Sequence, residues 1–225
     1  MAATRPKPAY FDNPRPEVAV LLPARSTHVL EVGCGAGRFA AQVPQRQSYW
    51  GIEPAAGAAD EARAVLDEVI HGTFEDAASR LPDRHFDLVI CNDVIEHIAN
   101  PEAFLQAVQA KMAPGAVMVG SVPNVRYLPN LLQLVLHKDW AYADEGVLDR
   151  THLRFFTARS LERTVVEQGF EVEALVGLNS IIAHSPWPGR LRWAATLALL
   201  ELATLRGQGD TRFLQFGFRI RPRRN

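Results

Sequence analysis

Three glycines at alternate positions, Gly33, Gly35 and Gly37, follow an apolar run that contains Glu31. Glycine adopts a positive φ at little cost and allows a ligand to approach the backbone closely. A helix expected after the turn would add unpaired amide groups at its N-terminus. The segment therefore predicts a binding shelf for a flat or extended small molecule at the end of a strand.

The residue after the third glycine distinguishes between two cofactors that such a turn could bind. The dinucleotide fingerprint is G-x-G-x-x-G, in which the last glycine allows close helix packing below the pyrophosphate. This chain has Arg38 at that position. Glu31 precedes the first glycine by two residues and suits a cationic amine rather than a phosphate. The pattern favours S-adenosylmethionine over NAD.

The run from Val29 to Gly37 resembles the first motif of the class I S-adenosylmethionine-dependent methyltransferases, a hydrophobic run, an acid and G-x-G-x-G. Residues 149–157 resemble a segment of bacterial small-molecule methyltransferases, a subgroup that includes ubiquinone-type O-methyltransferases and enzymes of polysaccharide biosynthesis. The resemblance implies a seven-stranded sheet whose last strand is antiparallel and inserted beside the sixth.

The same resemblance assigns cofactor contacts. Glu53 is expected to end the second strand, where a carboxylate accepts hydrogen bonds from both ribose hydroxyls. Phe74 could pack on the adenine ring. Glu75 or Asp76 could accept from the exocyclic amine, although Asp76 could instead cap a short helix. Asn92, after the fourth expected strand, is placed against the methionine part of the cofactor.

Two histidines are the candidate acid–base groups. His97 follows the fourth expected strand, and the ordinary histidine pKa of about 6.5 allows it to accept a proton at neutral pH. His152 could be a second proton acceptor or could position a hydroxyl. Each could instead have a structural role, at a helix start or in a hydrogen bond. We expect a small-molecule acceptor with oxygen as the favoured nucleophile, because a base assists when a hydroxyl loses its proton.

Two groups of arginines could bind an anionic substrate. For Arg150 and Arg154, ion pairs with Asp149 and Glu162 are the favoured interpretation. The C-terminal group is interpreted as a solvated edge, with an anion-binding patch as the alternative. Its members are Arg219, Arg221, Arg223 and Arg224.

Composition and spacing argue against several partners. A formal net charge of −1 at pH 7 does not provide the basic surface that nucleic-acid binding requires. No run reaches the roughly 18 apolar residues of a membrane span, and no export signal is visible.

Cys34 and Cys91 suit a reducing compartment, so a cytoplasmic location is expected. No metal is predicted, because the carboxylates form no paired cluster and four histidines lack ligand spacing, namely His71, His85, His137 and His184.

Strands alternate with helices along the 225 residues, of which 48% are hydrophobic. This alternation predicts an α/β, Rossmann-like fold with an open, doubly wound, mostly parallel sheet. Ligands of such sheets lie beyond the carboxyl ends of the strands. Strands are expected at residues 28–31, 48–52, 68–71, 86–91, 117–122, 170–176 and 213–220. Helices are expected at residues 18–22, 37–43, 58–66, 101–113, 157–168 and 191–205.

One domain is expected over residues 1–225, with a cap segment at 1–27, a lid at 125–150 and a helical insertion at 178–210. The apolar helix at 191–205 is expected to cover the sheet or a partner subunit, which would make the chain an oligomer. A wall of the substrate site or a peripheral membrane contact is the alternative. Aromatic residues expected in the lid are Tyr10, Phe11, Tyr127, Trp140 and Tyr142.

Three other functions fit less of the sequence. A non-catalytic protein that binds S-adenosylmethionine with the same fold would share the glycines and Glu53, which indicate binding rather than turnover. A NAD-dependent oxidoreductase is disfavoured by Arg38. RNA methylation would require a basic surface and an appended RNA-binding module, and the sequence shows neither.

Overall fold

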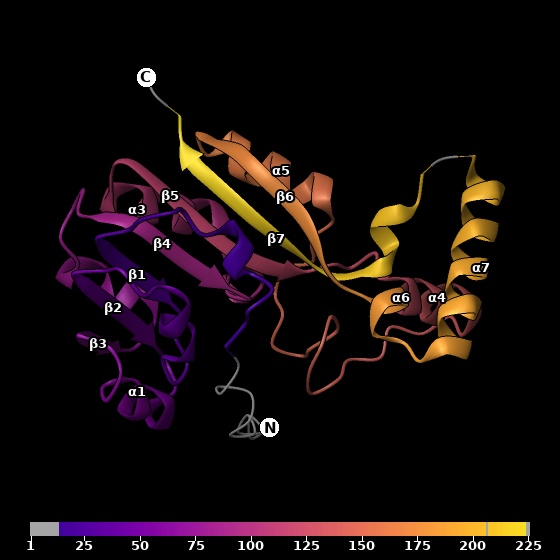
Figure 1. Ribbon diagram of the computed structural model, residues 1–225, viewed down its shortest axis with the longest axis horizontal. Helices are drawn as coiled ribbons and strands as arrows, with labels where there is room; N and C mark the ends of the chain where they lie inside the picture. The colour runs from indigo at the N-terminus through magenta and orange to yellow at the C-terminus, as the bar shows by residue number, and fades with distance from the viewer. Residues whose placement is uncertain (1–13, 206, 224–225) are drawn as a thin grey trace.

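Seven strands form a single sheet in the computed structural model, which describes residues 14–205 and 207–223 (Figure 1). The strands are β1 (His28–Val32), β2 (Ser48–Glu53), β3 (Glu68–His71), β4 (Phe86–Asn92), β5 (Met112–Pro123), β6 (Phe170–Ser180) and β7 (Phe213–Pro222). Their order across the sheet is β3-β2-β1-β4-β5-β7-β6. Pairs among β1 to β5 are parallel, and β7 is antiparallel to both of its neighbours. The prediction of a seven-stranded, mostly parallel sheet with an inserted antiparallel last strand is confirmed.

The central strands β1 and β4 are apolar because both of their faces are covered. Their side chains alternate between the faces, as strand geometry requires. Leu30 and Val89 belong to the core on one face, whereas Val29 and Leu88 belong to the core on the other. All four are fully buried. The continuous apolar run at residues 86–91 is therefore that of a strand covered on both sides.

Helices cover both faces of the sheet. The described α-helices are α1 (Ala56–Ala62), α2 (Phe74–Ala77), α3 (Pro101–Lys111), α4 (Leu128–Leu136), α5 (Ala158–Glu167), α6 (Ile181–His184) and α7 (Trp187–Thr204). The described 3₁₀ helices are Ala19–Leu21, Arg38–Gln42, Ala78–Arg80, Ile95–His97 and Gly209–Arg212. Helices α2, α3 and α5 supply side chains to the core on one face. Helix α1 and the first two 3₁₀ helices pack on the other face.

The helix expected at 37–43 is present as the 3₁₀ helix Arg38–Gln42. Gly37 precedes it with a φ of 77°, and Val43 follows with φ −120° and ψ 73°. Val43 leaves the helical conformation because Pro44 comes next, and a residue before proline disfavours the α region. Too few residues remain between the glycine turn and the proline for a regular α-helix.

Two other helices differ from prediction at their ends. Helix α3 begins at Pro101 as expected, where proline suits the first helical position. It ends at Lys111 rather than 113, because Met112 adopts extended angles and begins β5. Helix α1 lies at Ala56–Ala62 rather than 58–66.

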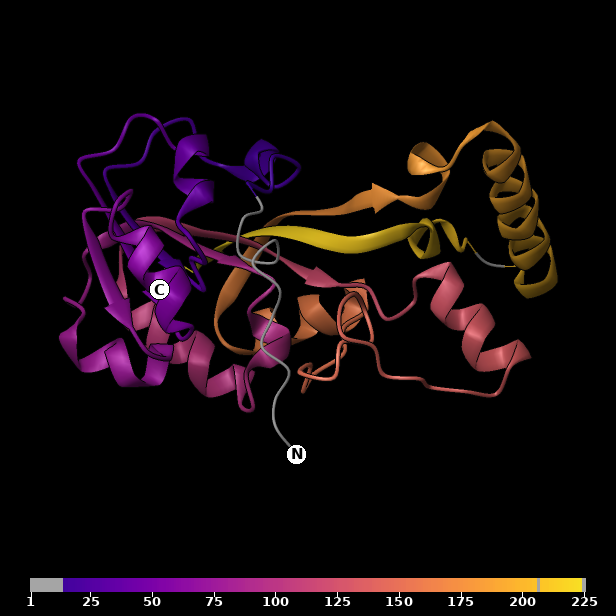
Figure 2. The same ribbon diagram turned by 90° about the horizontal axis from the view of Figure 1, so that it is seen from below.

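The helix expected at 191–205 does not cover the sheet, and this part of the expectation is wrong. Helix α7 lies at one end of the molecule with α4 and α6 (Figures 1 and 2). Its main contacts are with α6 and the 3₁₀ helix Gly209–Arg212, and Leu197 is the one buried residue within α7. The pairing of β6 with β7 continues beyond the last β5 pair, so these two strands carry the helices past the sheet. None of the described helices, α7 included, has the length and apolar character needed to span a membrane.

Gly120 tests the packing of β5 between β4 and β7. A Cβ at Gly120 would lie 2.1 Å from the carbonyl oxygen of Cys91, and backbone atoms cannot move aside as a side chain can. We expect Gly120→Ala to lower the free energy of unfolding by about 1–3 kcal/mol. At Gly57 in α1 an added Cβ meets nothing within 4 Å, so Gly57→Ala is the control and should raise it by about 0.5–1 kcal/mol. Urea unfolding measures both, and an unchanged midpoint for Gly120→Ala would contradict the strand register.

Candidate functional site

The glycine turn after β1 has left-handed backbone angles. Gly33, Gly35 and Gly37 have φ values of 69°, 52° and 77°, a region that strains residues with a Cβ. The amides of Gly33 and Cys34 donate to the Ile52 carbonyl at 2.8 and 3.1 Å. Burial raises the pKa of the Cys34 thiol. The turn is therefore fastened to the end of β2 as a fixed shelf.

Glu53 ends β2 beside this turn. One carboxylate oxygen accepts a hydrogen bond from the Gly35 amide at 2.9 Å, and the other accepts from the Ala55 amide at 2.8 Å. Burial raises the pKa of Glu53, which is 3% exposed. An ionised carboxylate has about four lone-pair positions. Acceptor capacity therefore remains for the ribose contact that the sequence predicts.

Glu31 lies beneath the shelf and is 2% exposed. Its carboxylate accepts a hydrogen bond from the Tyr49 hydroxyl at 2.7 Å. Burial raises the pKa of Glu31 to about 8, the charge of Glu53 also raises it, and the Tyr49 hydrogen bond opposes the shift. Near neutral pH the group therefore holds a proton, and a nearby cation would favour its release.

The loop after β3 bears out the capping interpretation of Asp76. Thr73 Oγ1 accepts from the Asp76 amide at 3.3 Å, and the Asp76 carboxylate accepts from the Thr73 amide at 3.1 Å. The hydrogen bond from the Thr73 amide, together with one from the Thr73 hydroxyl at 2.9 Å, lowers the pKa of Asp76. Phe74 is buried and packs edge-on against Phe104, with ring centroids 5.0 Å apart. Of the two predicted adenine contacts, Phe74 thus lies in the core and Glu75 is exposed.

The carboxyl end of β4 carries an amide without a partner. The oxygen and the nitrogen of the Asn92 side chain are both buried, and neither has a hydrogen-bond partner among the described residues. A buried polar group left in this state costs about 1–3 kcal/mol. A ligand with polar groups at this position would satisfy Asn92, which fits the predicted cofactor contact.

Next to Asn92, Asp93 is the centre of a polar network that sequence reasoning missed. Asp93 has a φ of 52° and forms an ion pair with Arg15. Its carboxylate accepts from Ser121 Oγ at 2.8 Å and from Gln215 Nε2 at 2.9 Å. The network joins the segment before β1 to β4, β5 and β7 at the same edge of the sheet. Its members are too far apart in the sequence to form a motif.

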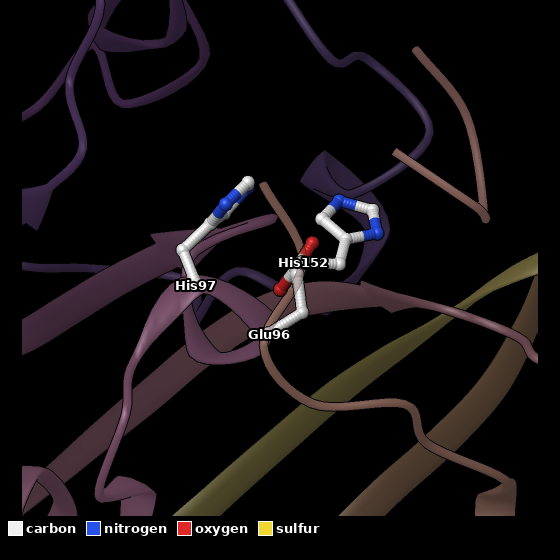
Figure 3. Close-up of side chains that lie close together, drawn as sticks. All are labelled: Glu96, His97 and His152. Atoms are coloured by element: carbon white, nitrogen blue, oxygen red, sulfur yellow. The ribbon is translucent and has the colours of Figure 1, made fainter. Parts of the chain in front are cut away.

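Glu96, His97 and His152 converge beside this edge (Figure 3). One potential ligand atom from each residue lies within 4.8 Å of the others. The two imidazole centroids are 4.8 Å apart, with the ring planes at 72°. The amides of Leu153 and Arg154 donate to the Glu96 carbonyl at 2.8 and 3.0 Å, which holds the two segments together.

Backbone carbonyls fix the tautomers of both histidines. His97 Nδ1 is 3.2 Å from the Thr151 carbonyl oxygen, and His152 Nδ1 is 3.0 Å from that of Val147. A carbonyl only accepts, so each Nδ1 carries the hydrogen and each Nε2 presents a lone pair. Burial, with the charge of the second imidazole, lowers the pKa of His97. Both rings can therefore accept a proton at Nε2.

Glu96 is the member of this cluster that the sequence analysis missed. It is 1% exposed, both carboxylate oxygens lack a partner among the described residues, and burial raises its pKa well above the usual range. Two imidazole lone pairs and a carboxylate form a donor set that could hold a divalent cation. The absence of a metal remains a prediction, because that prediction considered only how the possible ligands are spaced along the sequence. The available signal was an acid next to His97 in a short, otherwise apolar turn.

Aromatic residues of the predicted lid gather around Phe155. Its ring centroid lies 5.3 Å from Trp140, 6.5 Å from Tyr142 and 6.4 Å from His152. The lid segment therefore contributes an apolar wall beside the histidine pair. Tyr10 and Phe11, which were also predicted for the lid, lie outside the described residues.

The ion-pair partners expected for Arg150 and Arg154 are wrong. Arg150 pairs with Asp144 at 2.9 Å, and Arg154 donates to the carbonyl of Ala99. Asp149 is buried and accepts hydrogen bonds from the amide and hydroxyl of Thr151, two residues further along the chain. The Asp149 carboxylate, which was expected to pair with the arginines, is therefore used in hydrogen bonds within its own turn.

The C-terminal arginines follow the solvated-edge interpretation where the structure describes them. Arg219 pairs with Glu173 at 2.6 Å, and Arg221 pairs with Glu171 at 3.1 Å. These ion pairs join β7 to β6 across the outer part of the sheet. Arg224 lies outside the described residues.

Glu53 offers a direct test of the predicted cofactor position. We expect Glu53→Ala to weaken S-adenosylmethionine binding by about tenfold or more, because hydrogen bonds to charged groups contribute roughly 1.5–3 kcal/mol. Titration calorimetry measures the affinity. The control is Glu68→Gln, because Glu68 begins β3 and lies at the end of that strand away from the site. This variant removes an exposed carboxylate and should leave the affinity within about twofold. Unchanged binding by Glu53→Ala would reject the ribose assignment.

Known proteins resemble this chain in sequence or in architecture. A family model described as "Methyltransferase domain" matches residues 9–175. The mitochondrial ubiquinone biosynthesis O-methyltransferase of Rattus norvegicus is 26% identical over 189 residues, which cover 79% of this chain and 52% of that protein. The ubiquinone biosynthesis O-methyltransferase of Azorhizobium caulinodans is 26% identical over 167 residues, which cover 70% of this chain and 64% of that protein. The chain thus spans about half to two thirds of the length of these relatives.

A solved structure of an S-adenosylmethionine-dependent methyltransferase from Archaeoglobus fulgidus has the same fold. The TM-score is 0.65 at 14% sequence identity, and the match covers 95% of this chain and 94% of that one. The expectations of the fold class and of a methyltransferase domain are confirmed by these matches. The chain belongs to the family of proteins that contain this methyltransferase domain.

Proposed function

We propose that this chain transfers a methyl group from S-adenosylmethionine to an oxygen atom of a small-molecule acceptor. The observation that carries the proposal is the pair of Nε2 lone pairs on His97 and His152, which lie just beyond the carboxyl end of β4. The two relatives from Rattus norvegicus and Azorhizobium caulinodans are named as O-methyltransferases, which agrees with oxygen as the acceptor. The acceptor itself is defined only by class.

The cofactor would be held along the edge formed by β1, β2 and β4. The glycine turn offers its backbone as the shelf, and Glu53 accepts from the ribose hydroxyls. Asn92 would pair its unsatisfied amide with the methionine part. Glu31 lies beneath the shelf, where its ionised form would stabilise a positive charge.

Bound S-adenosylmethionine supplies an activated methyl group on its sulfonium, so the protein has mainly to position the acceptor and receive a proton. His97 would accept the proton of the acceptor hydroxyl at Nε2. Its lowered pKa keeps the imidazole neutral and ready at physiological pH. His152 positions the hydroxyl or accepts from it, and the aromatic group around Phe155 limits the access of water.

Location and assembly stay at the level of the sequence predictions. A location in the cytoplasm is proposed because both thiols are free and buried and need no oxidising compartment. Assembly through the apolar helix predicted at 191–205 stays a prediction, and so does the absence of a nucleic-acid partner. The net charge of −1 supports the latter.

Methyl transfer can be tested before the acceptor is identified. We expect the chain, incubated with methyl-labelled S-adenosylmethionine and metabolite extracts, to label a small molecule that mass analysis identifies. With that acceptor, His97→Asn should lower kcat by about 10²- to 10⁴-fold because it removes the Nε2 base. The asparagine amide can still donate to the Thr151 carbonyl, so S-adenosylmethionine affinity should be retained. Tight cofactor binding without labelling of any extract would favour a non-catalytic binding protein instead.

Glu31 predicts a proton linkage on cofactor binding. At pH 7 its pKa of about 8 leaves most of the free protein protonated at this group, and the cationic cofactor should expel that proton. Calorimetry at pH 7 in two buffers of different ionisation enthalpy should detect the release of most of one proton.

Matched variants assign the released proton. Glu31→Gln should abolish the release. Tyr49→Phe should preserve it, because loss of the Tyr49 hydrogen bond raises the pKa of Glu31 further. Equal proton counts for the unaltered chain and Glu31→Gln would place the cation elsewhere.

A further inference from the structure

Three residues with left-handed backbone angles meet at the carboxyl edge of the central strands. Arg15, Asp93 and Asn179 have φ values of 46°, 52° and 54°, a region that strains residues with a Cβ. Gln215 connects two of them, because it donates to the Asp93 carboxylate at 2.9 Å and accepts from the Asn179 amide at 3.0 Å. Strain of this kind persists where surrounding contacts hold it, and it is concentrated at functional sites.

The Arg15 guanidinium contacts three side chains of this network. It forms an ion pair with Asp93, donates to Ser121 Oγ at 2.9 Å and pairs with Glu17 at 2.9 Å. The Arg15 side chain is 13% exposed. A guanidinium with its donors engaged in this way fixes the orientation of its partners, because its donors form a rigid planar fork.

The segment that carries Arg15 is anchored on one face of the sheet. Val18 and Leu21 are buried in the core that also contains Ile90 of β4. Side chains alternate along a strand, so Asn92, two residues after Ile90, lies on the same face. The Arg15 segment therefore packs on the face to which the unpartnered Asn92 amide belongs.

Asp93 also controls the contact between the loop after β4 and the glycine turn. The Asp93 amide donates to the Ser121 carbonyl at 3.0 Å. Val94 follows Asp93 and packs against the turn, since a Cβ added at Gly33 would lie only 2.8 Å from Val94 Cγ2. The backbone conformation of Asp93 thus sets the direction of Asn92 on one side and of Val94 on the other.

We propose that Arg15 is a positioning residue for the cofactor site. Its ion pair keeps Asp93 in the left-handed conformation, and Asp93 in turn holds Asn92 and Val94 in place. The inference rests on the proposed cofactor position and adds the segment before β1 to the parts of the chain that determine affinity. Arg15 acts through Asp93 and is not assigned a contact with the cofactor. A site ordered in advance binds more tightly because less ordering remains to be done on binding.

Titration calorimetry of the full chain with S-adenosylmethionine tests the proposal. Arg15→Met and Asp93→Asn should each weaken binding by about tenfold or more, because either change removes the ion pair. Arg15→Lys keeps the charge and should restore the affinity to within about threefold of the unaltered chain. The double variant Arg15→Met with Asp93→Asn should bind within about threefold of Asp93→Asn alone, because both changes act through one contact.

Controls separate a displaced site from a weakened fold. Arg221→Met removes ion pairs with Glu171 and Glu173 at the other end of β7 from Gln215, and should leave the affinity within about twofold. Urea unfolding shows whether each variant is folded. If Arg15→Met does not fold, Ser121→Ala replaces it in the same cycle, because it removes a single hydroxyl from the network.

The outcomes also distinguish this inference from the cofactor position on which it rests. Weaker binding by Glu53→Ala with full affinity in Arg15→Met would overturn the role of Arg15 alone. Unchanged binding in both variants would reject the cofactor position itself. The role of Arg15 is also overturned if the losses multiply in the double variant, or if Arg15→Lys binds no better than Arg15→Met.

Discussion

Parallel pairing of β4 with β1 is the constraint on which the candidate site depends. Because paired parallel strands end at the same edge, the glycine turn after β1 and the polar residues after β4 must lie side by side. Continuous burial of both strands keeps this register from slipping, since a shift by one residue would turn every side chain to the opposite face. Glu53 then adds a direct tie from β2 to the turn. The order of the strands in the sheet therefore fixes the position of the site more than any one residue does.

Sequence reasoning succeeded where the signal is local. The β3 prediction at residues 68–71 coincides with the observed strand, and the apolar run at 86–91 misses β4 only by its last residue. The helix predicted at 37–43 is present, but it is short and of the 3₁₀ type because Pro44 keeps the residue before it out of the α region. The helix at 191–205 was recognised, but its position was not. Apolar residues on all sides of α7 do not specify which face packs, and the extension of β6 and β7 is a tertiary feature.

The candidate site divides in the same way. The glycine turn, Glu53 and Asn92 follow strand ends, so their placement could be predicted once the strands were recognised. The approach of His152 to Glu96 could not, because it depends on backbone hydrogen bonds between two loops 50 or more residues apart. Such bonds involve no particular side-chain type and leave no pattern in the sequence. The same limit applies to Arg15, whose ion pair with Asp93 spans 78 residues.

The placement of the two cysteines has a practical consequence. Cys34 lies in the shelf and Cys91 in β4; both are buried and unoxidised, and burial raises the pKa of each thiol. Thiolate is the species that alkylating and maleimide reagents attack, so neither native sulfur competes for such a label in the folded state. A single cysteine introduced on the surface would therefore carry a spectroscopic probe at one defined point. The native chain is thus already suited to site-specific distance and orientation measurements.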